Sequence, residues 1–240
     1  MIKKALEYIV SLSTPYIEKI NGEVYSDKPL NRISYVPRAE SIEMNTLSSL
    51  VDYIKSSVDS FCDMMIIHVQ SPTRVSMYSA LDAERKREYV VAVRANVPEF
   101  NFNQFMDHEA FCIGVQSKFI DHPSTDKALL LKFAGTVEAG SVAEYGDDGV
   151  SQKATVKTGI ASKGEAIVPS PAVLQPFRTF VEVEQPCSSF IFRMKDNRCG
   201  GIQCALYEAD GGAWKISAME AIKAYLTEAL KEYSGFIIIS

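Results

Sequence analysis

Three short segments rich in β-branched and aromatic residues follow one another between residues 64 and 95, and they constrain the fold more than any other feature of the sequence. They are Met64–Gln70, Val75–Leu81 and Glu88–Ala95, and residues of these types favour β-strands. They are separated by a short connection that contains Ser71-Pro72 and by a charged turn at Asp82–Arg87. Because short turns connect antiparallel neighbours, we predict an antiparallel β-meander.

Apolar residues with helical spacing lie on both sides of this meander. They predict a helix at 46–59, with Asn45 or Thr46 as its N-cap. Its apolar stripe consists of Leu47, Leu50, Val51, Ile54 and Val58. After the meander, a second helix is predicted at Asn101–Lys118. For the apolar run Asp126–Ala134, periodicity leaves helix and strand open.

The second half of the chain reads as β-hairpins. Thr136–Tyr145 and Val150–Ile160 flank the turn cluster Gly146–Gly149, so we predict that they pair. Prolines at 169, 171 and 176 place 168–176 at a sheet edge or in a loop, because proline donates no ladder hydrogen bond. Three further strands are predicted at Arg178–Glu184, Ser189–Lys195 and Ile202–Tyr207.

The C-terminal region combines a helix with an apolar tail. Ser217 and Glu220 match a capping box, and the apolar stripe behind them ends before Gly235, which predicts a capped C-terminal helix. With antiparallel meanders and hairpins and three or four helices, the predicted fold class is α+β. The tail has no charge and must be paired or covered, by its own sheet or by another subunit. Its residues are candidate assembly contacts: Phe236, Ile237, Ile238 and Ile239.

The first 45 residues differ in character from the rest of the chain. Helical spacing of apolar residues predicts a short helix over residues 1–12. Residues 13–41 are rich in turn-forming types, so we expect irregular structure, either an extended arm on a neighbouring molecule or a long surface connection. We therefore divide the chain into an N-terminal helix and arm at 1–45 and a single α+β domain at 46–240.

Composition and charge narrow the classes of partner. Lys and Arg total 25 against 30 Asp and Glu, a net charge of −5, which argues against a dedicated binder of duplex DNA or anionic membranes. The apolar runs are far too short to span a bilayer. Five cysteines, an odd number without a C-x-x-C pair, favour a reducing compartment. Since no signal-peptide cleavage site follows the N-terminal lysines, we predict a cytoplasmic protein.

The sequence contains no recognised catalytic constellation. It has no G-x-S-x-G, G-x-x-x-x-G-K-[ST] or G-x-G-x-x-G motif. His68, His108 and His122 form no H-x-x-x-H pair, and the cysteine spacing matches no zinc site. Asp147 and Asp148 are flanked by glycines, as in a solvated turn. We therefore expect no catalytic residue, no metal, no cofactor and no enzymatic activity.

Four cations are candidate contacts for a nucleotide or a single-stranded nucleic acid. Arg85 and Lys86 belong to the one cationic cluster, although acidic neighbours favour a solvated hairpin tip there. Arg178 and Arg193 lie on predicted strands that also contain phenylalanines, a combination that could present a platform for bases. Alternating apolar residues on a strand more often belong to a core.

The hairpin segment Asp147-Asp148-Gly149-Val150-Ser151-Gln152, with Pro176-Phe177-Arg178-Thr179-Phe180 and Glu184-Gln185-Pro186, resembles the YfdQ-like family of uncharacterised phage and prophage proteins. The resemblance covers most of residues 45–232, including a helix with a phenylalanine-rich face at Phe102 and Phe105. It implies a viral or prophage-derived gene that acts in the bacterial cytoplasm. It carries over no catalytic residue, and it does not extend to the N-terminal segment or the apolar tail.

These features lead to two functional hypotheses. The first is a non-enzymatic protein that self-assembles into a homo-oligomer, such as a ring or a shell, because an arm-like segment and an apolar tail both need a partner surface. The alternative is an accessory factor that binds a nucleotide or a single strand in phage replication, recombination or counter-defence.

Overall fold

The computed structural model describes residues 2–29, 38–61, 64–139, 141–147, 152–158, 162–167, 170–197 and 201–240. Its contacts divide the chain into an N-terminal unit, Met1–Ala39, and a body, Glu40–Ser240, whereas the sequence analysis placed the division after residue 45. The described residues form five helices and four β-sheets, which confirms the α+β class. None of the described helices is long and apolar enough to cross a lipid bilayer.

The N-terminal unit consists of a helix and a hairpin. Helix α1 spans Ile2–Ser13, as predicted, and strands β1 (Ile17–Ile20) and β2 (Glu23–Ser26) pair antiparallel. Asn21 and Gly22 connect the strands with φ of 53° and 89°, the left-handed conformations that a tight hairpin turn requires. The expectation of irregular structure here is therefore wrong for the hairpin, whose signal was the Asn-Gly pair.

The larger of the body's sheets has five strands in the order β14-β4-β5-β6-β3. Its central strands β4, β5 and β6 form the predicted antiparallel meander. Both edge strands run parallel to their neighbours, β14 beside β4 and β3 beside β6. The strands are β3 (Ile42–Met44), β4 (Met65–Ser71), β5 (Arg74–Ser79), β6 (Tyr89–Arg94) and β14 (Phe236–Ile239).

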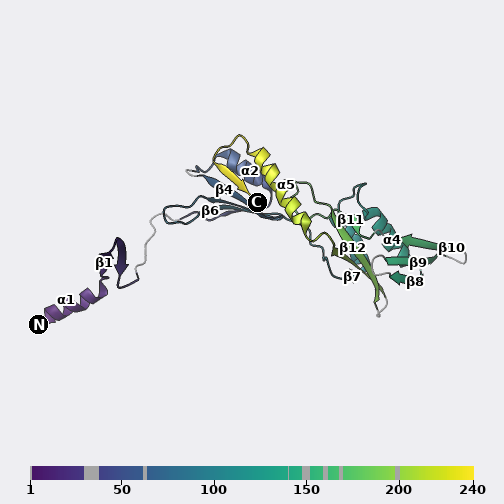
Figure 1. The fold of residues 1–240 in the computed structure, drawn as a ribbon, viewed down its shortest axis with the longest axis horizontal. Helices are drawn as coiled ribbons and strands as arrows, with labels where there is room; N and C mark the ends of the chain where they lie inside the picture. Colours follow the sequence, from purple (N-terminus) through teal and green to yellow (C-terminus); the bar gives the residue numbers. More distant parts are fainter. Residues whose placement is uncertain are drawn as a thin grey trace. The chain divides into compact units, whose positions relative to one another are not determined.

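Helices α2 (Leu47–Ser56) and α5 (Ala213–Ala229) cover one face of this sheet (Figure 1). Thr46 caps α2, because its Oγ1 accepts a 3.2 Å hydrogen bond from the Ser49 N–H. The helix predicted at 46–59 is thus confirmed as far as Ser56, with Thr46 as its cap. Val58, the last residue of the predicted stripe, lies beyond the helix and is 77% exposed. The core between helices and sheet is largely aliphatic and includes Leu50, Ile54, Ile67, Met77, Val93, Ile222 and Leu226.

The C-terminal helix is capped by a residue other than the one predicted. Helix α5 begins at Ala213, so Ser217 lies inside it and its Oγ donates to the Ala213 carbonyl. The carboxylate of Asp210 instead accepts from the N–H groups of Gly212 (3.0 Å) and Trp214 (3.4 Å). The predicted capping box is therefore wrong, because the helix begins four residues before Ser217. Asp210 accepts from the N–H groups of the N-cap residue Gly212 and of Trp214 in the first turn instead.

A second sheet has the order β11-β12-β13-β7. Helix α3 (His108–Lys118) and helix α4 (Lys127–Ala139) contribute to its core, which is rich in phenylalanine: Phe111, Phe119, Phe133, Phe190 and Phe192. Strand β11 lies at the edge, as the prolines predicted, and Asp126–Ala134 is resolved in favour of helix. The strands are β7 (Met106–Asp107), β11 (Ala172–Leu174), β12 (Ser188–Asn197) and β13 (Gly201–Glu208).

Two predictions in this region are wrong. The helix predicted from Asn101 begins only at His108, where the Asp107 side chain accepts from the Glu109 N–H. Residues 178–184 do not form a strand. Their backbone groups bond to a side chain instead of a strand ladder: Gln185 accepts from the N–H groups of Arg178 and Thr179 and donates to the Phe180 carbonyl.

The remaining sheet has the order β10-β9-β8. Strands β8 (Ser141–Asp147) and β9 (Gln152–Thr158) pair antiparallel, which confirms the predicted hairpin, although its first residues belong to α4. Strand β10 (Ser162–Ile167) was not predicted. The turn residues Asp148 and Gly149 lie outside the described residues.

The segment between β11 and β12 connects the two cores of the body. Phe180 and Val183 are buried in the aliphatic core, whereas Leu174 and Phe190 belong to the phenylalanine-rich one. Thr179 Oγ1 donates to the Pro72 carbonyl (2.5 Å) in the turn between β4 and β5.

Candidate assembly surfaces and a buried arginine network

The apolar tail pairs with its own sheet and keeps part of its surface exposed. Phe236 and Ile238 pack against the aliphatic core. Ile237 and Ile239 alternate with them and are 43% and 39% exposed. The sequence left open whether the tail is covered by its own sheet or by another subunit. In the structure β14 pairs with β4 of its own sheet on one side, and no described strand lies on its other side.

The N-terminal unit leaves nearly all of its apolar side chains exposed. None of its described residues is buried, and only Pro15 and Lys28 are half-buried. Helix α1 nevertheless carries an apolar face, and the hairpin adds further aromatic and branched residues. The exposed large side chains are Ile2, Leu6, Tyr8, Ile9, Val10, Leu12, Tyr16, Ile17, Ile20, Val24 and Tyr25.

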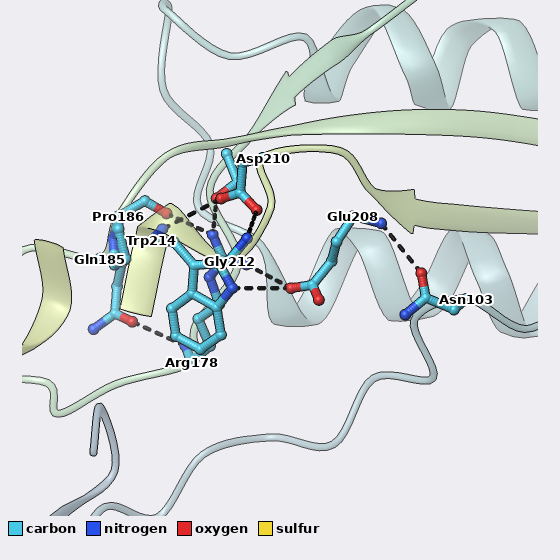
Figure 2. A network of polar contacts seen from close by, with 9 residues as sticks. Asn103, Arg178, Gln185, Pro186, Glu208, Asp210, Gly212 and Trp214 are labelled. Carbon is cyan, nitrogen blue, oxygen red and sulfur yellow. Dashed lines mark hydrogen bonds and ion pairs between the residues drawn. The ribbon is translucent and has the colours of Figure 1, made fainter. Parts of the chain in front are cut away.

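Arg178 is at the centre of a polar network in the body rather than on its surface (Figure 2). Its Nη1 donates to Glu208 Oε1 over 3.1 Å, and its Nη2 donates to the Pro186 carbonyl and to Ser188 Oγ. Its guanidinium carbon lies 4.0 Å from the centroid of the Trp214 ring. The cation therefore links β12, β13 and the start of α5.

Burial and charge shift two pKa values in this network. Burial lowers the pKa of Arg178 to about 10, against the opposing charges of Glu208 and Asp210, so the guanidinium stays protonated at neutral pH. For Asp210, burial alone would raise the pKa. Hydrogen bonds from Ser188, Gly212 and Trp214, with the charge of Arg178, outweigh burial and lower it.

The four candidate cations do not share one site. Arg85 and Lys86 are exposed in the loop between β5 and β6, where Lys86 pairs with Glu84 at 3.2 Å. Arg178 adjoins Thr179, whose contact with Pro72 is at the opposite end of β5. Arg193 lies on β12. In the described structure the guanidinium of Arg178 is already engaged with Glu208 and Ser188.

The histidines are likewise separated. His68 lies 3.2 Å from the Tyr78 hydroxyl on the sheet, His108 contacts the Ala134 carbonyl at 3.1 Å, and His122 contacts Ser124 in a loop. Among the residues that the structure describes, no group of three or more His, Cys, Asp or Glu is placed to hold a metal ion.

A cleft of about 300 Å³ lies between residues 97–102 and 176–178. Phenylalanines 100, 102 and 177 contribute to its lining, with Glu99, Lys118 and Arg178 as charged members. The Lys118 ammonium donates to the Glu99 carbonyl. Neighbouring acids and bases do not converge there in a pattern that indicates proton transfer or nucleophilic chemistry.

Sequence reasoning missed the most informative features of these regions. The role of Arg178 was hidden because its partners Ser188, Glu208 and Trp214 lie 10, 30 and 36 residues further along the chain and are brought together through β12–β13 pairing. Comparison with known proteins found no matching family model, no similar curated protein and no similar solved structure.

Proposed function

We propose that this is a non-enzymatic phage or prophage protein that assembles with copies of itself, using its N-terminal unit as an arm that binds the body of another copy. One observation carries the proposal: the N-terminal unit is an ordered helix and hairpin without a buried residue among those described. The phage or prophage origin is supported only by the sequence resemblance.

Elements of this size do not hold themselves together in water. An isolated helix of 12 residues is marginal even with good helix formers. An isolated two-stranded hairpin is also marginal. Their apolar faces must therefore be covered for the unit to be stable, and exposed apolar patches of this kind mark interaction surfaces.

Charge complementarity favours the body of this chain as the covering surface. Residues 1–39 contain six Lys and Arg against four Asp and Glu, whereas the rest of the chain contains 19 against 26. The N-terminal unit is thus weakly cationic and the body anionic, and such opposite charges favour encounter between copies. Nucleotide or single-strand binding has less support, because Arg178 is engaged with Glu208.

The native mass of the full chain tests this proposal. Sedimentation velocity should give a multiple of 26.6 kDa for the unmodified protein. Leu6→Glu, on the apolar face of α1, should lower the mass, because a charge in a buried apolar contact is unfavourable. Ser11→Glu is the matched control: it adds the same charge on the polar face and should leave the mass unchanged. A single-chain mass for the unmodified protein would reject the proposal.

A further inference from the structure

The two edges of the five-stranded sheet are protected to different degrees. Strand β3 has three residues, and its Glu43 forms an ion pair with Arg94 of β6 at 3.8 Å. Short, charged edge strands resist pairing with other chains. Strand β14 has no charged residue and consists of Phe236 and three isoleucines. An uncharged apolar edge of this kind is a template for a further strand.

The hydrogen bonds of β14 identify which of its backbone groups face outward. The Met65 N–H donates to the Gly235 carbonyl over 2.8 Å. Since backbone groups alternate in direction along a strand, the N–H and C=O groups of Ile237 and Ile239 also point toward β4. The N–H and C=O groups of Phe236 and Ile238 therefore point away from β4, along the open edge of the sheet. No described strand forms hydrogen bonds with them.

We infer that β14 pairs antiparallel with β14 of a second copy, about a two-fold axis at Ile238, so that the two five-stranded sheets become one. The inference shares with the proposed function only the premise that copies associate, and it uses a different surface. In this register Ile238 exchanges both backbone hydrogen bonds with Ile238 of the second copy, and Phe236 lies opposite Ser240. Ile237 then lies opposite Ile239, twice.

The exposed side chains fit this register. Ile237 and Ile239 are on the face away from α2 and α5, where 43% and 39% of their surfaces are exposed. Two-fold pairing places Ile237 of each copy opposite Ile239 of the other copy. Such cross-strand apolar pairs stabilise a sheet. The second copy is favoured over a different partner because the strand is self-complementary under this rotation and carries no charge that would select another sequence.

A charge series at these two positions tests both the contact and its register. Ile237→Lys with Ile239→Lys places like charges opposite each other, as does Ile237→Glu with Ile239→Glu. Ile237→Lys with Ile239→Glu places opposite charges against each other in both pairs. Each double variant is made in the full chain, with and without Leu6→Glu, and its mass is followed by sedimentation velocity over a range of concentrations.

We expect the two like-charged variants to weaken the dimer on the order of tenfold or more, because like charges directly opposite are unfavourable. The mixed-charge variant should stay close to the unmodified tail. An equimolar mixture of the two like-charged variants should form heterodimers, which also shows that both are folded.

Equal association in all variants, or equal loss in all three, would overturn the inference, as would a mixture that does not associate. If Leu6→Glu alone leaves the mass unchanged, the arm proposal fails while the charge series still decides the role of β14. If β14 instead pairs with the N-terminal hairpin, the equimolar mixture of the two like-charged variants should associate as weakly as each variant alone. That result would also count against two-fold pairing.

Discussion

The N-terminal unit and the body contain similar apolar residues but bury them very differently. Leu6 of α1 is 56% exposed, whereas Leu50 of α2 has no exposed surface, and both belong to short amphipathic helices. A hydrophobic stripe therefore predicts a helix without saying where its covering surface lies. In the body the surface is a sheet of the same chain; for the N-terminal unit we propose another copy.

A matched pair of leucine truncations tests this difference in burial most directly. Leu50→Ala should lower the free energy of unfolding of the body by about 2–5 kcal/mol, through lost burial and a cavity. Leu6→Ala should change it by less than about 0.5 kcal/mol in dilute solution, where assembly contributes little. Denaturant titration followed by the fluorescence of Trp214, the one tryptophan of the chain, measures both. Equal losses would show that α1 is part of the body's core.

A second pair compares two cations that hold backbone carbonyls. Arg178→Leu should destabilise the body by about 2 kcal/mol, because Glu208 loses its buried partner while solvent still reaches it. Lys28, which donates to the carbonyls of Leu12 in the last turn of α1 and of Thr14 just after it, is the control. Lys28→Leu should leave the unfolding midpoint of the body unchanged. Circular dichroism is the appropriate signal, since Arg178 stacks on Trp214.

Local patterns predicted the parts of the fold that local physics determines. The meander and α2 followed from strand propensity, helical spacing and the Thr46 cap. The Asn21-Gly22 turn was equally local, and its hairpin signal was overlooked. The parallel position of β14 beside β4 is different: it joins the last strand to one from the first third of the chain, and no local pattern encodes that pairing.

The polar network shows why the candidate site could not be predicted in full. The sequence pattern predicts a strand at Arg178–Glu184. Gln185 bonds to that backbone instead, and this leaves the guanidinium free to turn toward Glu208 and Trp214. Such side-chain replacement of a strand ladder depends on three-dimensional neighbours rather than on spacing.

The smallest expected effect is a change in how the stability of the body depends on pH. It is expected for substitution of Asp210 and not for substitution of Asp27. Asp210 caps α5, and its pKa is lowered in the folded body. A carboxylate with a lowered folded pKa stabilises the fold above its unfolded pKa, near 4, and this contribution is lost as the pH falls through the lower, folded value. Asp210→Asn should therefore reduce the loss of stability in acid and lower stability at pH 7 by about 1 kcal/mol, typical of a helix cap.

Asp27 accepts a 2.6 Å bond from the Tyr16 N–H in the exposed hairpin. Asp27→Asn should leave the acid limb of the body's unfolding curve unchanged, and a matching change there would mean that the hairpin is coupled to the body.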